Sequence, residues 1–302
     1  MGFLYFLENL RFPFLDRFLL LITQLGEETA FLVIALILFW CIDKRAGYYL
    51  LSVGFIGTLS NQFMKLWFRV PRPWVIDPNF TILEQAREAA AGYSFPSGHT
   101  QSAVGTFGVL AAVTKKRWIR ISAVVIAVLV SFSRMYIGVH TPLDVLVAAT
   151  IAVGLIILLK PVVFNDSGKY IPVLLAFMTA AAVGFQCFVS YYPFPSDVDT
   201  HNLQSGIKNA YTLIGSLAGL LVVYVLDVKW IRFTTKAVWW VQFLKIAGGL
   251  ILVLLVKSLL KTPLNTVFGE SVGRAVRYAL IVISAGTIWP LTFRALSRLG
   301  SK

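Results

Sequence analysis

The sequence predicts an all-α membrane protein, a polytopic bundle of about nine transmembrane helices. Hydrophobic residues make up 58% of the 302 residues and charged residues only 14%, whereas soluble domains carry roughly 25% charged residues. The mean hydropathy is +0.77. The apolar residues gather into long runs, and short charged segments separate these runs. Together these observations exclude both a water-soluble globule and a disordered chain.

The nine helices are expected at the apolar runs. The first 25 residues are too often interrupted by charge and proline to span a bilayer, so the segment 1–25 is expected to lie at the membrane interface. The runs that follow are each close to the roughly 20 residues that a spanning helix needs. The predicted spans are 26–42, 46–68, 98–114, 118–138, 142–162, 170–190, 206–226, 238–260 and 274–294.

The distribution of charge orients the predicted helices. The loops on the side that holds residues 43–45 carry fifteen Lys and Arg against three Asp, and the rest of the chain carries twelve against eleven acidic residues. The positive-inside rule then places the C-terminus in the cytoplasm and the N-terminus outside. The basic residues lie in short loops between spans, which argues against a nucleic-acid partner. Cys41 and Cys187 lie inside apolar runs, which disfavours a disulfide framework or a zinc site.

Basic side chains stand at the outer ends of two predicted spans. Lys65 ends the second span and is followed by Arg72, and Arg134 ends the fourth. Ionisable residues beside a span are functional hypotheses by default. Each of these side chains alone could also be a cation that reaches to the lipid headgroups. The prolines on either side of Arg72 favour a fixed geometry instead.

The third predicted span begins with a possible anion site. Ser97, Gly98 and His99 open this span. Ser97 alone is explained by a helix cap. The free amides of a helix N-terminus next to a glycine also form an anion site, and His99 would then lie in the first turn beside the anion.

A histidine and an aspartate open the fifth predicted span. Thr141, Pro142 and Asp144 fit a helix cap, which leaves His140 unexplained. A carboxylate four residues on can hold a histidine in one tautomer, as a nucleophile or a base requires. Three cations, a helix N-terminus and two histidines on one side of the membrane therefore predict a phosphoryl-transfer site that needs no metal.

The order and spacing of these residues resemble the type 2 phosphatidic acid phosphatase superfamily. Its pattern Lys-x6-Arg-Pro fits residues 65–73, Pro-Ser-Gly-His fits residues 96–99, and Ser-Arg-x5-His-x3-Asp fits residues 133–144. The resemblance covers about residues 20–160. A topology of nine spans with an outward N-terminus is in addition similar to the glucose-6-phosphatase branch.

The resemblance implies a role for each of these residues, and it implies no cofactor and no metal. His140 attacks phosphorus and forms a phosphohistidine, Asp144 orients His140, and His99 protonates the leaving oxygen. The implied phosphate-binding set is Lys65, Arg72, Arg134, Ser97 and Gly98. The core of the phosphatase is expected over 26–165, with its site on the outer face. Four additional helices are expected over 166–302, and the sequence does not indicate their role.

The function expected from these residues is hydrolysis of a lipid phosphate or diphosphate in a bacterial plasma membrane. Phosphatidic acid, phosphatidylglycerophosphate and a polyprenyl diphosphate are the candidate substrates, and membrane lipids are the expected partners. A phosphatase for a sugar phosphate is the alternative, and a lipid-binding or transport protein without catalysis is a third hypothesis. The segment 74–95 could lie on the membrane surface and favours a lipid entrance. The oligomeric state is not indicated.

The polar run 196–201 carries Asp197, Asp199 and His201 and could be a metal-ligand cluster. An exposed polar loop is the simpler interpretation, because the run lies between two predicted spans.

Overall fold

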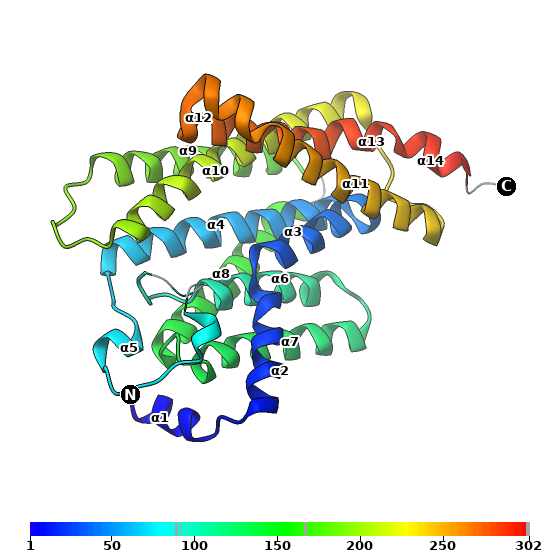
Figure 1. The fold of residues 1–302 in the computed structure, drawn as a ribbon. Coiled ribbons are helices and arrows are strands. Elements are labelled where there is room, and N and C mark those ends of the chain that lie inside the picture. Colours follow the sequence, from blue (N-terminus) through cyan, green and yellow to red (C-terminus); the bar gives the residue numbers. More distant parts are fainter. Residues whose placement is uncertain (88–89, 91, 166–167, 300–302) are drawn as a thin grey trace. The chain divides into compact units, whose positions relative to one another are not determined.

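The computed structural model describes all residues except 88–89, 91, 166–167 and 300–302, and helices are the only regular structure in that part of the chain (Figure 1). Six of these helices are long and apolar enough to cross a membrane. They number seven if the bent pair Pro13–Gly26 and Glu28–Ile42, with 54° between its two parts, is one span. The prediction of an all-α membrane protein is therefore confirmed, whereas the count of nine spans is not.

Two predicted spans are helical but are not among these six helices, because one is too polar and the other is too short. The second predicted span is α4 (Lys44–Phe68), and the third is α6 (Gly98–Val113), which has only 16 residues. The polar residues of α4, among them the buried Asn61 and Lys65, lower its hydropathy. Both helices bring residues to the site described below.

The chain forms two compact units. The first comprises residues 1–32, 53–160 and 193–206. In it α6 packs along α7, and α2 also packs against α7 (Figure 1). Besides α6 and parts of α3, α4, α8 and α10, its elements are α1 (Gly2–Asn9), α2 (Pro13–Thr23), η1 (Gln24–Gly26), α5 (Pro73–Ile76), η3 (Glu84–Ala86) and α7 (Arg117–Tyr136).

The N-terminal segment forms two short helices. Leu4 and Leu7 of α1 and Leu19 of α2 are buried, whereas Phe6 and Phe14 are exposed. This pattern gives each helix one protein-facing side and one apolar side that faces outward. The Nε of Arg11, between the two helices, donates to the Tyr136 carbonyl at 3.1 Å and ties this segment to α7.

The segment 74–95 differs from the expected surface helix. Its described residues contain the end of α5 and the short turn η3, and no longer helix. Ile82, Ala86 and Ala90 are buried, and the last two belong to a core cluster with Leu19 and Tyr136. Ile82, Ala86 and Ala90 therefore face the protein interior, whereas Val75 and Ile76 at the start of the segment are exposed.

The second unit comprises residues 33–52, 161–192 and 207–302. In it α11 and α12 pack against each other. Its elements, some of which continue into the first unit, are α3 (Glu28–Ile37), η2 (Leu38–Ile42), α8 (Pro142–Val163), α9 (Ile171–Tyr191), α10 (Thr200–Leu226), η5 (Asp227–Ile231), α11 (Trp239–Leu259), α12 (Lys261–Ile283), η6 (Ser284–Ile288), α13 (Trp289–Leu291) and α14 (Phe293–Leu299).

Two details of the second unit concern helix packing and helix bounds. A Cβ at Gly215 would overlap the carbonyl of Ala275, so α10 and α12 pack closely at this residue. The last predicted span begins earlier than expected, since α12 starts at Lys261 and is broken at Gly269. Gly269 has a φ of 76°, which glycine tolerates and which lets the helical path change direction.

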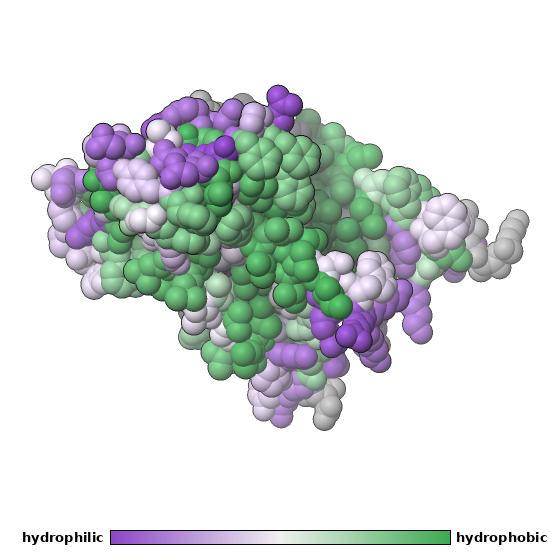
Figure 2. Space-filling model, turned by 90° about the horizontal axis from the view of Figure 1, so that it is seen from below, coloured by the Kyte–Doolittle hydropathy of each residue, from purple (hydrophilic) through white to green (hydrophobic). Residues whose placement is uncertain are grey.

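Large apolar side chains face outward on many of the helices. Figure 2 shows one face of the molecule, on which hydrophobic residues cover a broad area and hydrophilic residues gather beside it. Trp118, Ile157, Phe177 and Phe243 are each exposed by 66% to 68%. Apolar surface on this scale is typical of a lipid-facing protein.

Candidate active site

Every residue of the predicted site lies in the first unit, at the ends of helices. Lys65 is in the last turn of α4, and Arg134 is in the last turns of α7. Ser97 precedes α6, His140 precedes α8, and Arg72 precedes α5. Five of the six ionisable members are buried, with exposed fractions of 9% or less, and His99 is partly buried. The buried ionisable members of the predicted set are Lys65, Arg72, Arg134, His140 and Asp144.

Helix α6 begins where the sequence predicts. The Oγ of Ser97 accepts a hydrogen bond from the amide of Thr100 at 3.4 Å, so Ser97 is the cap. The amide of Ser97 donates to the carbonyl of Asp144 at 3.1 Å, which joins the start of α6 to α8. The side chain of Asn61 donates to the carbonyl of Pro96 at 3.2 Å and fixes the turn before Ser97 from the side of α4.

One oxygen of Asp144 serves both the helix cap and the histidine. Its Oδ2 accepts from the amide of Thr141 at 2.7 Å, which is the capping contact expected of the sequence. The same Oδ2 lies 3.4 Å from Nδ1 of His140. The capping and the orienting interpretations of Asp144 are therefore compatible, because one carboxylate oxygen makes both contacts.

Arg72 contacts Nε2, the ring nitrogen of His140 that does not face Asp144. One terminal nitrogen of its guanidinium lies 3.0 Å from Nε2 of His140 and donates to the Val139 carbonyl at 2.9 Å. An arginine can only donate, so Nε2 is the acceptor in this contact and the ring proton of neutral His140 lies on Nδ1. That proton points toward Asp144, and Nε2 is the nitrogen that carries the electron pair, which accepts from Arg72 in this structure.

Burial and positive charge both act on His140. Burial lowers the pKa of His140 well below its usual range, and the positive charge of Arg72 lowers this pKa further, as do Arg134 and Lys65. Burial also lowers the pKa of Arg72 to about 10, which leaves Arg72 charged at neutral pH. The imidazole of His140 is therefore neutral at pH 7, as a nucleophile must be.

The other two cations are held by backbone and hydroxyl oxygens. Nζ of Lys65 donates to the carbonyl of Tyr93 at 2.6 Å. One terminal nitrogen of Arg134 donates to the hydroxyl of Thr23 at 2.8 Å. No acidic residue among the described ones forms an ion pair with Lys65 or Arg134, so their positive charge is not cancelled by a salt bridge.

His99 lies in the first turn of α6, close to η1. A Cβ at Gly26 would lie 2.9 Å from the backbone oxygen of His99, so α6 approaches η1 very closely. His99 lies near enough to His140 that a proton on His99 would lower the pKa of His140. The structure thus brings the eight predicted site residues to one region.

Two family models match this chain. The PAP2 superfamily model matches residues 45–168, and the model described as PAP2 superfamily phosphatase, transmembrane extension, matches residues 211–302. The phosphatidylglycerophosphatase B of Bacillus subtilis (strain 168) is 31% identical over 164 residues, which are 50% of this chain and 76% of that relative. The chain belongs to the PAP2 superfamily.

Other relatives are named as phosphatases of different substrates. An undecaprenyl-diphosphatase of Sulfolobus acidocaldarius is 31% identical over 44% of this chain and 63% of its own length. The human sphingosine-1-phosphate phosphatase 2 is 27% identical over 85% of this chain and 66% of its own length. A probable sphingosine-1-phosphate phosphatase of Dictyostelium discoideum is matched over only 52% of its length. No solved structure matches this chain.

The PAP2 site contains a serine that the sequence analysis missed. Ser94 is fully buried, and its Oγ donates to Oδ2 of Asp144 at 2.5 Å and lies 3.4 Å from Nδ1 of His140. Ser94 thus shares the carboxylate oxygen that faces the histidine. The only sequence signal was its place two residues before the Pro-Ser-Gly-His motif, which is too general to single out a serine.

Residues at the start of α10 brace the loop that holds two of the cations. The Nε of Arg72 donates to the carbonyl of Gly92 at 3.0 Å, and Lys65 is held by the next carbonyl, that of Tyr93. The hydroxyl of Tyr93 accepts from the amide of Asp199 at 2.9 Å. A Cβ at Gly92 would overlap the side chain of Asn202. We call Asp199 and Asn202 the brace.

Asp199 of the brace lies in the polar run 196–201, which the sequence presents as a metal-ligand cluster or an exposed polar loop. Oδ1 of Asp199 accepts from the amide of Asn202 at 2.7 Å, so it caps α10. Within the described part of the chain, no three His, Cys, Asp or Glu side chains gather as a metal site would require. The run is thus the start of a helix and a support for the loop at 92–93.

Tyr93→Phe should weaken the binding of inorganic phosphate by the purified protein about threefold to tenfold, because the loop whose carbonyls hold Lys65 and Arg72 loses one hydrogen bond. Calorimetric titration with phosphate measures this affinity. Tyr191→Phe is the matched control, since the Tyr191 side chain is 84% exposed. Equal phosphate affinity of the Tyr93→Phe variant and the unmodified protein would show that the brace does not position the cations.

Proposed function

We propose that this protein hydrolyses the phosphate or diphosphate of a membrane lipid without a metal ion, through a phosphohistidine at His140. The observation that supports the proposal most is the position of His140, between the carboxylate of Asp144 and the guanidinium of Arg72. The charges of Lys65 and Arg134 act on the same imidazole. Such a set of positioned cations is what phosphoryl transfer requires.

The proposed reaction uses two histidines in turn. Nε2 of His140 attacks phosphorus, and the bond from phosphorus to the lipid oxygen breaks. His99 gives its proton to that leaving oxygen, and the phosphohistidine remains. His99 then takes a proton from water, the water attacks phosphorus, and the phosphorus–nitrogen bond breaks to release inorganic phosphate. Asp144 stabilises the proton on Nδ1 of His140 in both steps.

The cations and the helix start are proposed to hold the phosphoryl group. Lys65, Arg72 and Arg134 would contact the equatorial oxygens, on which charge is spread in the transition state. The amide of Gly98 and the hydroxyl of Ser97 would donate to the same oxygens from the start of α6. Three cations with one carboxylate are a poor ligand set for Mg²⁺, which prefers oxygen donors.

A lipid is the substrate that the surroundings favour. Trp67 and Phe68 at the end of α4, and Val75 and Ile76 in α5, are exposed by 47% to 60% beside the site. The relatives are named for phospholipid, sphingoid and polyprenyl substrates. A phosphatidylglycerophosphate, a polyprenyl diphosphate and a sphingoid phosphate are thus the leading candidates, and a sugar phosphate is the alternative.

The topology that we propose contains nine spans. It counts α4 and α6 as spans despite their polar residues, and it assigns the phosphatase core to 26–165 and the extension to 166–302. The N-terminus and the site face the outside of a plasma membrane, and the C-terminus faces the cytoplasm, because the loops around 43–45 belong to the strongly basic side.

Phosphate release from a panel of substrates tests the proposed function. The purified protein, in detergent with excess EDTA, should release phosphate from phosphatidylglycerophosphate, undecaprenyl diphosphate or sphingosine 1-phosphate faster than from glucose 6-phosphate. Activity that EDTA abolishes and Mg²⁺ restores would contradict the metal-free mechanism. A preference for glucose 6-phosphate would support the sugar-phosphate alternative.

His140→Ala should abolish turnover of every substrate, because the nucleophile is lost. His99→Ala should still form the phosphoenzyme from substrates with good leaving groups, since those need little protonation. Rapid acid-free quenching and mass spectrometry of the labelled peptide locate the phosphate. Phosphate on His99 instead of His140 would reverse the two roles.

The acid limb of the pH profile of kcat/KM should lie below pH 6.5, the ordinary pKa of histidine, because the lowered pKa of His140 keeps the reactive neutral form at lower pH. Arg72→Gln removes a positive neighbour, so the pKa of His140 rises and the limb should move to higher pH. Arg72→Lys keeps the charge and serves as the control. An acid limb that stays in place in Arg72→Gln would argue that Arg72 does not act on His140.

Single cysteines test the proposed orientation in a background without Cys41 and Cys187. The exposed Asn79, in the loop beside the site, should react as Asn79→Cys with an impermeant thiol reagent in intact cells. The exposed Lys115, between α6 and α7, should react as Lys115→Cys only after permeabilisation. The opposite labelling pattern would place the site in the cytoplasm.

A further inference from the structure

The second unit contains a buried arginine that the candidate active site does not use. Arg277 lies in α12, beyond the break at Gly269, and only 5% of its surface is exposed. Its Nε and one of its terminal nitrogens are buried without a hydrogen-bond partner among the described residues. No acidic residue in that part of the chain forms an ion pair with it, and its guanidinium lies 5.7 Å from the centre of the Tyr278 ring. A buried charge without a counter-charge is costly, so Arg277 needs an explanation.

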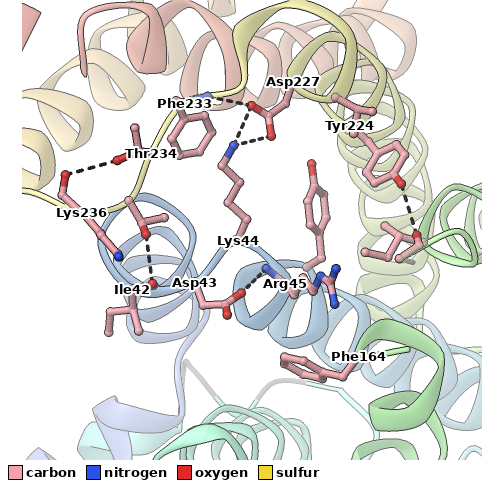
Figure 3. A pocket seen from close by; sticks show the side chains of 15 residues that line it. Ile42, Asp43, Lys44, Arg45, Phe164, Tyr224, Asp227, Phe233, Thr234 and Lys236 are labelled. Atoms are coloured by element: carbon pink, nitrogen blue, oxygen red, sulfur yellow. Dashed lines mark hydrogen bonds and ion pairs between the residues drawn. The ribbon is translucent and has the colours of Figure 1, made fainter. Parts of the chain in front are cut away.

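Two other cations of the second unit have partners inside the protein. Nζ of Lys44 donates to both carboxylate oxygens of Asp227, at 2.6 and 2.8 Å. Figure 3 shows this lysine reaching across a pocket to that carboxylate. Lys245 is fully buried, and its ammonium donates to the carbonyl of Thr235 at 3.3 Å. Arg277 differs from both, because it has neither a carboxylate nor a carbonyl to bind.

The chain doubles back on itself close to Arg277. A Cβ at Gly273 would lie 2.6 Å from the carbonyl oxygen of Leu264 and 3.0 Å from Cα of Asn265. The segment 261–268 therefore packs along the helix that follows the break. Helical side chains lean toward the N-terminus of their helix, and Gly273 is about one turn before Arg277. The guanidinium thus extends toward the place where the two segments meet.

Two further residues at this bend have polar atoms without partners. Nε of Arg274 is buried and unpartnered among the described residues, although one terminal nitrogen of this arginine lies 3.5 Å from Oε1 of Glu270. Oδ1 of Asn265 is likewise buried and unpartnered. Three nitrogens of two arginines and one amide oxygen are therefore unsatisfied. Most buried polar groups in proteins are satisfied, so this combination indicates a ligand that the chain itself does not supply.

The unsatisfied atoms define the chemistry of that ligand. Glu270 cancels the charge of one of the two arginines, which leaves one positive charge over. A guanidinium presents its donors in a fixed fork that matches the oxygens of a phosphate. Oδ1 of Asn265 only accepts, so the ligand also needs a donor such as a hydroxyl group. A phosphate ester that carries a hydroxyl meets both requirements.

The bend lies at the depth of lipid headgroups. It connects α11 to the rest of α12, and both helices are long and apolar enough to cross a membrane, so the bend is at a membrane surface. Arg277 is about 10 Å along the helix from Glu270, and its side chain reaches back toward the surface. Val267, Phe268 and Val272 are exposed by 72%, 50% and 46%. Acyl chains would find apolar surface next to the phosphate site.

The segment 261–268 is lightly held, which gives a ligand access to the buried nitrogens. Six of its eight residues are exposed. It is joined to the following helix through Gly269, whose φ of 76° glycine adopts without strain. Segments with few buried contacts open at low cost in free energy. A small displacement of this segment is enough to admit a phosphate between it and the helix.

We propose that Arg277, with Nε of Arg274 and Oδ1 of Asn265, binds the phosphate group of an anionic lipid whose headgroup carries a hydroxyl, as that of phosphatidylglycerol does. The phosphate oxygens accept from the two arginines, and the headgroup hydroxyl donates to the asparagine. The bound lipid supplies the counter-charge that Arg277 lacks. The proposal is independent of the phosphatase function, because none of these residues belongs to the candidate active site.

Native mass spectrometry of the full-length protein in neutral detergent with phosphatidylglycerol tests the proposal. The unmodified protein should retain one more phosphatidylglycerol molecule than Arg277→Met. A lipid bound at the active site is retained by both proteins, so this difference reports on Arg277. In Asn265→Ala the lipid concentration for half occupancy should rise about threefold to tenfold, since one hydrogen bond is lost. Equal retention by Arg277→Met and the unmodified protein would contradict the proposal.

Two control variants make the count specific. Arg277→Lys keeps the charge but loses the fork, so it should keep the lipid with an affinity about threefold to tenfold lower. Arg117→Met removes an exposed arginine at the start of α7 and should retain as many lipid molecules as the unmodified protein. Loss of the same lipid molecule in Arg117→Met would show that the count follows net charge and not this site.

Thermal unfolding separates lipid binding from a structural role of Arg277. Without lipid, Arg277→Met should have a higher Tm than the unmodified protein, because a buried unpaired charge is removed. Phosphatidylglycerol should then raise the Tm of the unmodified protein more than that of the variant, whereas phosphatidylcholine, which has no net charge, should not. A lower Tm of Arg277→Met both with and without lipid would assign Arg277 to the packing of the protein and overturn the proposal.

Two other outcomes would assign Arg277 to a different partner. Glycerol 3-phosphate has the same phosphate and hydroxyl groups without acyl chains, and it should shift the Tm less than phosphatidylglycerol does. An equal shift that is lost in Arg277→Met would assign the site to soluble phosphate esters instead of a lipid. A dimer without bound lipid that disappears in Arg277→Met would assign the guanidinium to a carboxylate of a second copy and overturn the proposal.

Discussion

The carboxylate of Asp144 is the interaction on which the rest of the site depends. Its Oδ2 accepts hydrogen bonds from the hydroxyl of Ser94 and the amide of Thr141, and it faces Nδ1 of His140. Its backbone carbonyl receives the amide of Ser97 at the start of α6. A buried carboxylate is costly unless donors surround it, so these contacts are mutually required. One residue therefore fixes the starts of two helices and the tautomer of a histidine.

The positive charges around Asp144 complement this arrangement. Three buried cations face one carboxylate, and they are held by the carbonyls of Gly92 and Tyr93 and by the hydroxyl of Thr23. Neutral acceptors orient the cations without cancelling their charge. The site as a whole thus keeps an excess of positive charge in a buried place, and an anion with two negative charges relieves the mutual repulsion of the cations. Such prior orientation is the main contribution a protein makes to phosphoryl transfer.

The predictable part of this protein is the part that motifs and hydropathy describe. All eight predicted site residues come to one region, because each stands at a helix end whose position the apolar runs define. Ser94, Tyr93 and Asn202 were not predictable, since their contacts depend on the path of a loop and on a distant segment. The number of spans was uncertain for a related reason, because α4 and α6 carry the polar residues of the site. The hydrophobic periodicity of the sequence does not predict the break at Gly269 in α12.

The brace has a consequence for biosynthesis. The loop at 92–93 holds Lys65 and Arg72, but Asp199 and Asn202 that support it are made more than a hundred residues later. A growing chain is synthesised from its N-terminus at about 5–20 residues per second, so the first five helices wait several seconds for the brace. During this time the cations lack their final support. A nascent chain that stops before residue 199 therefore holds every residue of the candidate site but lacks the brace.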